Sequence, residues 1–194
     1  LRAIAREGNG SQAVSLLLLE ISQVLLAGAR MGAQNDFTPR EEFQPDVLCL
    51  QETKCTDDAF PAMDFAAWGY DVVPHGEGRW NGVAIASRIG VEDIRPGLED
   101  ADLDVEARLL TVRCGEVHVV TAYVPNGRTL DAPQYEQKLA WLARLQALLA
   151  ERYDPAVDQV VLCGDLNIAP EDRDVYDPAL YVGTTHTSEP ERAA

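Results

Sequence analysis

Short apolar runs separated by turn residues occupy most of this 194-residue chain, and they constrain its fold more than any other feature. Such runs, bounded by Gly, Pro and acidic residues, are typical of β-strands. They predict strands at 46–50, 70–73, 83–87, 108–113, 117–123 and 159–164. Apolar residues at helical spacing predict a short helix near 61–68 and a long helix over 132–153. Strands interleaved with helices indicate a layered α/β domain whose functional site lies on loops at the strand ends.

The N-terminal part of the chain has a different pattern. Residues 13–29 carry apolar residues at helical spacing, which predicts an amphipathic helix packed against a core. Glu20 and two further polar residues interrupt this stretch, which is shorter than a membrane span, so neither a transmembrane helix nor a signal peptide is expected. We therefore divide the chain into an atypical helix and connector at 1–44, without a clear opening strand, and a strand-rich domain at 45–194.

The acidic balance of the chain limits how it could bind a polyanion. A net charge of −16 argues against a broad basic face for nucleic acid, since that mode relies on many Lys and Arg contacts to phosphates. A divalent cation would instead let an acidic pocket hold a phosphate. The acidic cluster at 99–106 lacks strand or helix periodicity, so a solvated loop is expected there and not a metal site.

The four cysteines show no spacing typical of zinc ligands. They are Cys49, Cys55, Cys114 and Cys163, and three of them lie in apolar runs. We expect reduced and mostly buried thiols, which are typical of a cytoplasmic protein.

A carboxylate and a carboxamide stand two residues apart where the last predicted strand ends, at Asp165 and Asn167. Side chains alternate along an extended chain, so both should project from the same side. A carboxylate and an amide aimed together can activate a water and hold a phosphate oxygen, which hydrolysis of a phosphodiester requires. A Gly-Asp turn after a buried strand is also ordinary turn chemistry, and that interpretation stays open for this motif taken alone.

Polar residues gather at three other strand ends. Residues 51–54 close the first strand of the domain, 80–82 open another, and 123–128 close a third. Each could be only a turn, but four such junctions are harder to explain in that way. Mg²⁺ favours oxygen ligands and few direct carboxylates, which Glu52 fits. A tyrosine hydroxyl and an amide can hold phosphate oxygens without adding repulsive charge.

Five short motifs follow one another along the domain. They are Leu-Gln-Glu-Thr-Lys at 50–54, Asp-Asp-Ala-Phe-Pro at 57–61, Trp-Asn-Gly-Val-Ala at 80–84, Tyr-Val-Pro-Asn-Gly at 123–127 and Gly-Asp-Leu-Asn-Ile-Ala-Pro at 164–170. In this order they resemble the exonuclease III family, the bacterial apurinic/apyrimidinic endonucleases of the endonuclease/exonuclease/phosphatase superfamily. The resemblance covers roughly residues 45–194. The Gln-Glu-Thr and Gly-Asp-x-Asn elements alone would indicate only the superfamily. The second and fourth motifs narrow the resemblance to the exonuclease III family.

The resemblance implies a two-sheet sandwich flanked by helices. It also implies a DNA repair enzyme that hydrolyses the DNA backbone 5′ to an abasic site and removes nucleotides from 3′ ends in duplex DNA, with Mg²⁺ or Mn²⁺. A sugar without its base has little stacking to lose on entering a pocket, which makes such selection physically reasonable.

The same resemblance assigns roles to individual residues. Glu52 would be a metal ligand, and Tyr123 a catalytic residue that contacts the phosphate. Asp165 would orient or deprotonate the attacking water, and Asn167 would position the phosphate through its amide. Contacts to the DNA backbone are expected from four neighbouring residues, Lys54, Asn81, Asn126 and Arg128.

Two motifs of that family have no counterpart in this sequence. One is the opening Trp-Asn-x-Asn motif, whose first Asn helps to organise the metal site; the other is a closing Ser-Asp-His motif, whose His is central to cleavage. None of the three histidines, His75, His118 and His186, can be assigned that role. We therefore expect a chain truncated at both ends and weak or inactive as a nuclease, because loss of such a group lowers the rate by about 10² to 10⁴.

Two other interpretations stay open. The chain could be another phosphoesterase of the superfamily that acts on a lipid or inositol phosphate, although the context of residues 123–128 weighs against this. It could also be a non-catalytic remnant that binds DNA or a partner through the surviving half of the site. Neither a membrane nor an obligate protein partner is expected.

Overall fold

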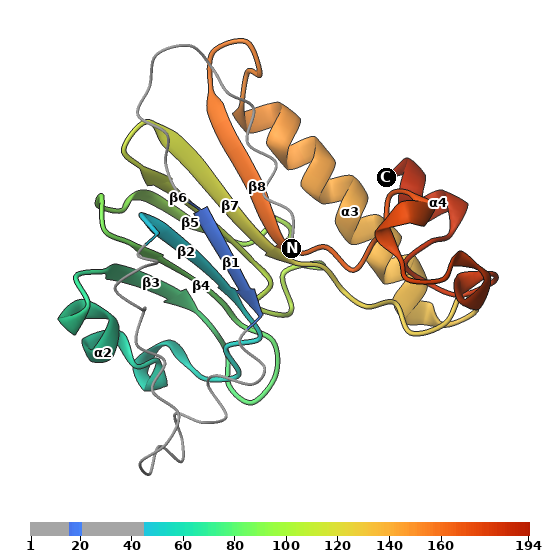
Figure 1. Ribbon diagram of the computed structural model, residues 1–194, viewed down its shortest axis with the longest axis horizontal. Coiled ribbons are helices and arrows are strands. Elements are labelled where there is room, and N and C mark those ends of the chain that lie inside the picture. Colours follow the sequence, from blue (N-terminus) through green and yellow to red (C-terminus); the bar gives the residue numbers. More distant parts are fainter. Residues whose placement is uncertain (1–15, 21–44) are drawn as a thin grey trace.

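The computed structural model describes residues 16–20, by their backbone, and 45–194. These residues form two four-stranded sheets that pack face to face (Figure 1). The first sheet has the order β1-β2-β4-β3 and contains β1 (Leu16–Glu20), β2 (Val47–Gln51), β3 (Asp71–His75) and β4 (Val83–Ser87). The second has the order β5-β6-β7-β8 and contains β5 (Glu92–Pro96), β6 (Leu109–Cys114), β7 (Val117–Tyr123) and β8 (Gln159–Asp165).

Alternating side chains of the strands divide the core into three clusters. Val47 and Cys49 on β2 point between the sheets and pack with side chains of β4, β6, β7 and β8. Their neighbours Leu48 and Leu50 point to the opposite face of the first sheet. There they pack with Phe65 of helix α2 (Ala62–Ala67), which follows a 3₁₀ turn η1 (Asp57–Ala59). Both faces of the central strands are thus buried, which is why their sequences are continuously apolar.

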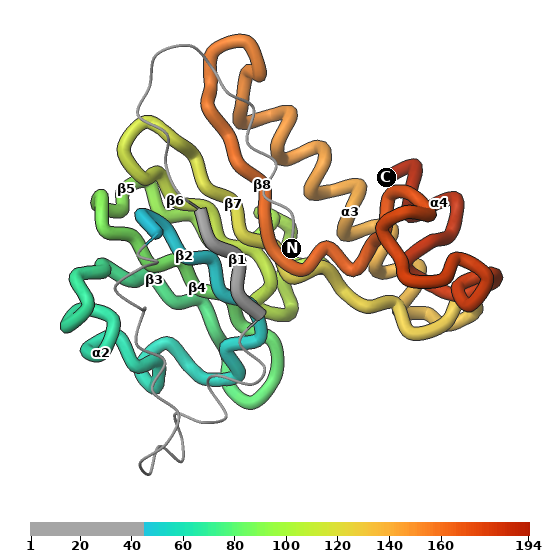
Figure 2. The backbone as a smooth tube through the Cα atoms, viewed as in Figure 1, coloured from blue at the N-terminus to red at the C-terminus, as the bar shows by residue number. Residues whose placement is uncertain are grey.

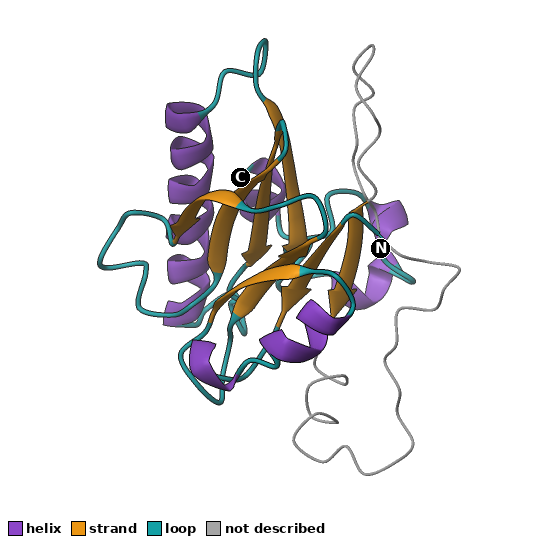
Figure 3. Cartoon of the chain, turned by 90° about the vertical axis from the view of Figure 1, so that its left-hand side faces the viewer, coloured by secondary structure: helices purple, strands orange, loops and turns teal. Residues whose placement is uncertain are grey.

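Helix α3 (Pro133–Arg152) covers the outer face of the second sheet (Figure 3). It begins with a proline, whose missing N–H would have no partner in the first turn in any case. Its buried stripe includes Trp141, Leu145 and Leu148, which pack with Val120 on β7. Helices on both outer faces complete the two-sheet sandwich that the family resemblance implies.

After β8 the chain runs past the N-terminal half of α3 in short elements (Figure 2). These are 3₁₀ turns η2 (Asp172–Asp174) and η3 (Pro178–Tyr181), and helix α4 (Glu189–Ala193). Ser188 caps α4 through a capping box with Glu191. This path brings residues near the C-terminal end of the chain against the loops that follow β7 and β8.

The helix expected over 13–29 is wrong where the structure describes it. Residues 16–20 form strand β1, which pairs in parallel with β2 and places Leu18 opposite Cys49. A run of four leucines matches a helical stripe, but such a continuous apolar run is equally typical of a strand in a parallel pair, and periodicity alone does not separate the two. The domain therefore has an opening strand, and the remainder of the expected helix lies outside the described residues.

Two smaller differences concern the sheet edges. Strand β5 was not expected, because all its residues are exposed and its sequence has no apolar alternation. It pairs with β6 through an irregular register. Strand β3 ends at His75, whereas the predicted strand ends at residue 73.

The acidic cluster forms a loop and most of the cysteines are buried, as the sequence predicts. Residues 99–106 form a loop in which the Asp104 carboxylate accepts the backbone N–H groups of Leu98 and Asp100, at 2.6 and 3.0 Å. All four cysteines are free, and all except Cys55 are buried. Within the described part of the chain, no helix combines the length and apolar character that crossing a membrane requires.

Candidate active site

The two sheets bring three strand ends to one edge of the molecule. The Gln51 amide at the end of β2 donates to the Thr121 hydroxyl on β7 at 2.9 Å, so the sheets are joined here by a buried hydrogen bond. Strands β7 and β8 are parallel, with Tyr123 opposite Asp165 in the register. The residues that follow β2, β7 and β8 therefore lie close together, although they are far apart in the sequence.

The Glu52 carboxylate lies between two predicted site residues. The Tyr123 hydroxyl donates to Oε1 at 2.6 Å, and Lys54 Nζ lies 2.6 Å from Oε2. Burial raises the pKa of Glu52, but the hydrogen bonds from Lys54 and Tyr123 outweigh it, so the pKa falls below its usual value of 4.5. Glu52 is thus a carboxylate at neutral pH, and 26% of its side chain is exposed.

Tyr123 is held in its protonated form. Burial and the hydrogen bond to the Glu52 carboxylate raise its pKa well above the usual value of 10, and the nearby charge of Asp165 adds to this rise. The Arg108 guanidinium opposes it, lying 4.7 Å from the ring centre and donating to the Tyr123 carbonyl at 3.1 Å. The hydroxyl in this state can donate a hydrogen bond but does not act as a base.

Asp165 and Asn167 form one compact turn after β8. The Asn167 backbone N–H donates to Asp165 Oδ1 at 3.1 Å, and its side-chain amide donates to the Val124 carbonyl at 2.8 Å. The Val124 N–H in turn donates to the Asp165 carbonyl at 2.9 Å. Gly164 is required before this turn, because a Cβ there would lie 2.0 Å from the Ala122 carbonyl oxygen. The Gly-Asp-x-Asn sequence therefore fits one strand end tightly against its neighbour.

Left-handed backbone conformations gather in these loops. Five of the eight predicted site residues have a positive φ, between 49° and 59°. They are Glu52, Lys54, Asn81, Arg128 and Asn167. Such conformations are uncommon for residues other than glycine, and they concentrate at functional sites, where the surrounding structure holds them. This concentration marks the loops as a functional region independently of their side-chain chemistry.

The predicted residues divide into two groups. Glu52, Lys54 and Tyr123 are in direct contact, and Asp165 and Asn167 follow on the adjacent strand. The Asn81 carbonyl accepts the Lys54 N–H at 2.9 Å, which places Asn81 in the same group.

Asn126 and Arg128 form the second group. The side-chain amide nitrogen of Asn126 lies 3.1 Å from His186 Nε2, and the Arg128 carbonyl accepts the Thr185 hydroxyl at 3.3 Å. These two bonds run to the segment before α4, and no described hydrogen bond joins Asn126 or Arg128 to Glu52.

Sequence reasoning missed Arg108 and the contact of His186 with Asn126. Arg108 begins a predicted strand, and an arginine in that place gives no signal that its guanidinium covers a tyrosine on the next strand. His186 is one of three histidines to which the sequence assigns no role. Both contacts join residues distant in sequence, which local motifs do not report.

The site offers few ligands for a cation. The described residues hold no group of three or more His, Cys, Asp and Glu side chains that could bind a metal. Mg²⁺ retains several waters and uses one or two carboxylates together with substrate phosphate oxygens. Glu52, ionised and partly exposed, fits that requirement, and a second carboxylate at this edge is Asp165, which lies opposite Tyr123 on β8.

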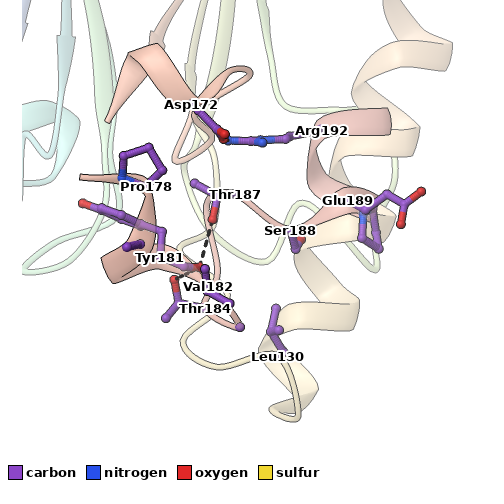
Figure 4. A pocket seen from close by; sticks show the side chains of 13 residues that line it. Leu130, Asp172, Pro178, Tyr181, Val182, Thr184, Thr187, Ser188, Glu189 and Arg192 are labelled. Atoms are coloured by element: carbon purple, nitrogen blue, oxygen red, sulfur yellow. Dashed lines mark hydrogen bonds and ion pairs between the residues drawn. The ribbon is translucent and has the colours of Figure 1, made fainter. Parts of the chain in front are cut away.

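A cavity of about 550 Å³ lies apart from these residues (Figure 4). It is lined by Leu130 and by parts of 172–192, including Tyr181, Val182 and Arg192. The threonine hydroxyls at its wall bond to the Tyr181 carbonyl. None of the predicted site residues lines this cavity, so it is distinct from the candidate active site.

Comparison with known proteins gives a family for this arrangement. The model of the endonuclease/exonuclease/phosphatase family matches residues 15–190. Exodeoxyribonuclease III of Haemophilus influenzae is 32% identical over 140 residues, which are 70% of this chain and 52% of that protein. The DNA repair nuclease APEX1 of Danio rerio is 33% identical over 151 residues, or 74% of this chain and 46% of that protein. The chain thus spans about half the length of these curated relatives.

Solved structures agree with this match. An AP endonuclease from Archaeoglobus fulgidus is 40% identical with a TM-score of 0.74, covering 77% of this chain and 57% of that one. The 3′ phosphatase NExo from Neisseria, bound to a product DNA hairpin, is 32% identical with a TM-score of 0.77, covering 93% and 68%. In sequence and in its two-sheet fold, the chain belongs to the endonuclease/exonuclease/phosphatase family and is similar to its exonuclease III and AP endonuclease members.

Proposed function

We propose that this chain carries part of the active site of a DNA repair phosphodiesterase, one that cleaves the backbone at abasic sites and removes nucleotides from 3′ ends of duplex DNA. The observation that carries the proposal is the Glu52 carboxylate bonded to the Tyr123 hydroxyl, beside Asp165 and Asn167 on the adjacent strand. Relatives named as exodeoxyribonuclease III and as AP endonuclease support the reaction, and the NExo complex with DNA supports the substrate class.

Glu52 is the proposed ligand of a divalent cation. The family depends on divalent metals, and we propose Mg²⁺ or Mn²⁺ here. Such an ion, when bound, neutralises charge on the scissile phosphate and allows an acidic protein to hold it. Lys54 occupies one oxygen of Glu52, but both side chains are partly exposed, so the lysine can turn away and leave that oxygen to the ion.

The remaining residues act on the phosphate and the water. Asp165 accepts a proton from, or orients, the attacking water, because it is the second carboxylate at this edge. The Asn167 amide donates to the Val124 carbonyl at 2.8 Å and more weakly to Asp165 Oδ2 at 3.4 Å, and the N–H of the weaker bond can turn to a phosphate oxygen. Tyr123 stays protonated and donates a hydrogen bond without adding negative charge.

Contacts to DNA are expected to be local, because the net charge is −16. Lys54 and Asn81 lie on one side of the Glu52 carboxylate, and Asn126 and Arg128 lie beyond the β7 end. We propose that these four residues contact the backbone of duplex DNA. We also place the protein in the cytoplasm, in keeping with its free cysteines.

Incubation with abasic-site duplex DNA and Mg²⁺ or Mn²⁺ tests the proposal. We expect slow cleavage that stops on chelation of the metal, since the opening Asn and closing Asp-His motifs have no counterpart in this sequence. Asp165→Asn should lower the rate at least about 100-fold. The matched control is Asp102→Asn in the exposed acidic loop, which should leave the rate unchanged.

Three outcomes would contradict the proposal in different ways. Faster hydrolysis of an inositol phosphate or a small phosphodiester than of abasic DNA would favour another phosphoesterase. DNA binding without metal-dependent cleavage would favour a non-catalytic remnant. Turnover near that of an intact exonuclease III would overturn the expectation of weak activity.

A further inference from the structure

A fully buried lysine lies beside the candidate active site without being part of it. Lys138 is on the buried face of α3 and has 0% exposed surface. The next residues on that face, Trp141, Leu142 and Leu145, are apolar members of the core. Charged side chains are almost never fully buried unless they are paired, because removal of the charge from water is unfavourable. The ammonium group therefore needs partners that compensate its burial.

Its partners are the two loops of the site. Lys138 Nζ donates to the Asn167 carbonyl at 2.7 Å and lies 3.5 Å from the Asn126 carbonyl. It also lies 2.5 Å from Glu191 Oε1. An ammonium group has three protons, and these three acceptors match them. One buried cation thus joins the loop after β7, the loop after β8 and helix α4.

The anionic partner is equally buried and fully bonded. Glu191 is 1% exposed, and its second oxygen accepts the Ser188 hydroxyl and N–H, at 2.7 and 3.1 Å. The Ser188 hydroxyl lies 2.6 Å from the Tyr135 hydroxyl, one turn before Lys138 on α3. A buried network whose members are all satisfied holds a single geometry.

The loop after β7 also packs closely on the aliphatic part of the Lys138 side chain. A Cβ added at Gly127 would lie 3.1 Å from Lys138 Cδ, and Gly127 has a φ of 85°. The glycine therefore allows the loop to approach the side chain. The close packing and the hydrogen bonds act on the same short segment.

We propose that Lys138, held in place by Glu191, is a positioning residue that fixes the backbone at Asn167 and Asn126. Asn167 has a left-handed backbone, with a φ of 49°, and its amide is aimed at the Val124 carbonyl and Asp165. Without the ammonium, the Asn167 carbonyl loses the partner that holds this conformation. The catalytic consequence rests on the proposed function, whereas the effect on the conformation of Asn167 does not.

The test compares Lys138→Met with Leu148→Ala. Methionine fills the space of the aliphatic part of the lysine without its charge. Leu148 is an almost equally buried residue of the same helix whose side chain cannot hydrogen-bond to either loop. At a temperature where both variants are folded, Lys138→Met should lower kcat on abasic DNA at least tenfold with KM within twofold. Leu148→Ala should keep kcat per folded molecule within twofold of the parent. Equal loss of kcat in both variants would mean that Lys138 serves stability alone.

A second readout is independent of nuclease activity. The side-chain amide of Asn167 gives its own pair of ¹⁵N–¹H resonances, which we expect to shift or broaden in Lys138→Met and to stay in place in Leu148→Ala. Unchanged resonances in Lys138→Met would overturn the positioning role. Absence of cleavage by the parent chain would overturn the proposed function only.

A double variant guards against failure to fold. Lys138→Met combined with Glu191→Met removes both charges, so no unpaired ion is left in the core. It should fold and still show displaced Asn167 resonances, since the hydrogen bond from Lys138 Nζ to the Asn167 carbonyl is lost. A folded double variant with the parental Asn167 resonances would contradict the proposal.

Discussion

Two lysine–glutamate pairs contact the loops of the candidate active site, and they differ in burial and not in chemistry. Lys54 and Glu52 lie 2.6 Å apart with side chains that are 29% and 26% exposed. Lys138 and Glu191 lie 2.5 Å apart with no exposed side-chain surface. The exposed pair can exchange partners with water, metal or phosphate, because each ion keeps part of its hydration. The buried pair has no such alternatives, so it fixes the loops on which the exposed groups act.

The largest expected effect on stability follows from breaking the buried pair. Lys138→Met leaves the Glu191 carboxylate without its cation, and such a change lowers the free energy of unfolding by about 3 to 5 kcal/mol. Urea unfolding followed by circular dichroism measures this. A loss no larger than that of Lys54→Met would remove the contrast between the pairs.

Breaking the exposed pair from the carboxylate side should affect activity and not stability. Glu52→Gln removes the proposed metal ligand and should lower metal-dependent cleavage by about 10² to 10³. The free energy of unfolding should change by less than about 1 kcal/mol, because the pair is partly exposed. Glu116→Gln, in the exposed turn between β6 and β7, is the matched control and should change neither quantity. Full activity of Glu52→Gln would show that the carboxylate is not needed.

Lowering the pH should reduce stability more through the glutamate of the buried pair than through that of the exposed pair. Burial raises the pKa of Glu191, but the bonds from Lys138 and Ser188 outweigh it, so the pKa in the folded state lies below the usual 4.5. A lowered folded-state pKa means that the ionised group stabilises the fold above the unfolded value, and that this contribution is lost as the pH falls through the folded value. The group contributes at most about 1.4 kcal/mol per pH unit to that decline.

Unfolding in urea at several pH values below about 5 measures the decline. Glu191→Gln should flatten it, and Glu52→Gln should do so less. The same slope in all three proteins would show that Glu191 does not contribute to acid sensitivity.

The smallest expected effect belongs to Lys54. Lys54→Met should change the free energy of unfolding by about 0 to 1 kcal/mol, since exposed ion pairs contribute little. It should lower the affinity for DNA, because Lys54 is proposed to contact the DNA backbone. The slope of log affinity against log salt concentration should also become shallower, by about the amount that one ionic contact contributes. Fluorescence anisotropy with a labelled duplex, at several salt concentrations, measures both quantities. An unchanged salt dependence would exclude Lys54 from the DNA contacts.

Local patterns in the sequence predicted the layered α/β class and polar residues at strand ends, whereas the two-sheet sandwich was predicted by the family resemblance. Apolar runs with turn residues marked the central strands, and the Gln-Glu-Thr and Gly-Asp-x-Asn motifs placed Glu52 and Asp165 at strand ends. Local patterns failed at β1, where a leucine run fits helix and strand equally, and at β5, where exposed residues carry no periodic signal.

The partnerships that organise the site could not be predicted. Lys138 and Glu191 are 53 residues apart, and Glu52 and Tyr123 are 71 apart. A lysine on an otherwise apolar helix face is a weak sign of burial, and it does not reveal which carboxylate it meets. Such contacts depend on how the two sheets and α4 come together, which is a property of the whole fold.

Binding of Mn²⁺ followed by NMR tests the central claim most directly, namely that Glu52 holds a divalent cation at the strand ends, beside Tyr123 and Asp165. Paramagnetic Mn²⁺ broadens nearby resonances, so saturable titration should broaden Tyr123 and Asn167 first, and Glu52→Gln should abolish this effect at the same concentrations. Broadening centred on the acidic loop at 99–106, or unchanged broadening at Tyr123 and Asn167 in Glu52→Gln, would contradict the account.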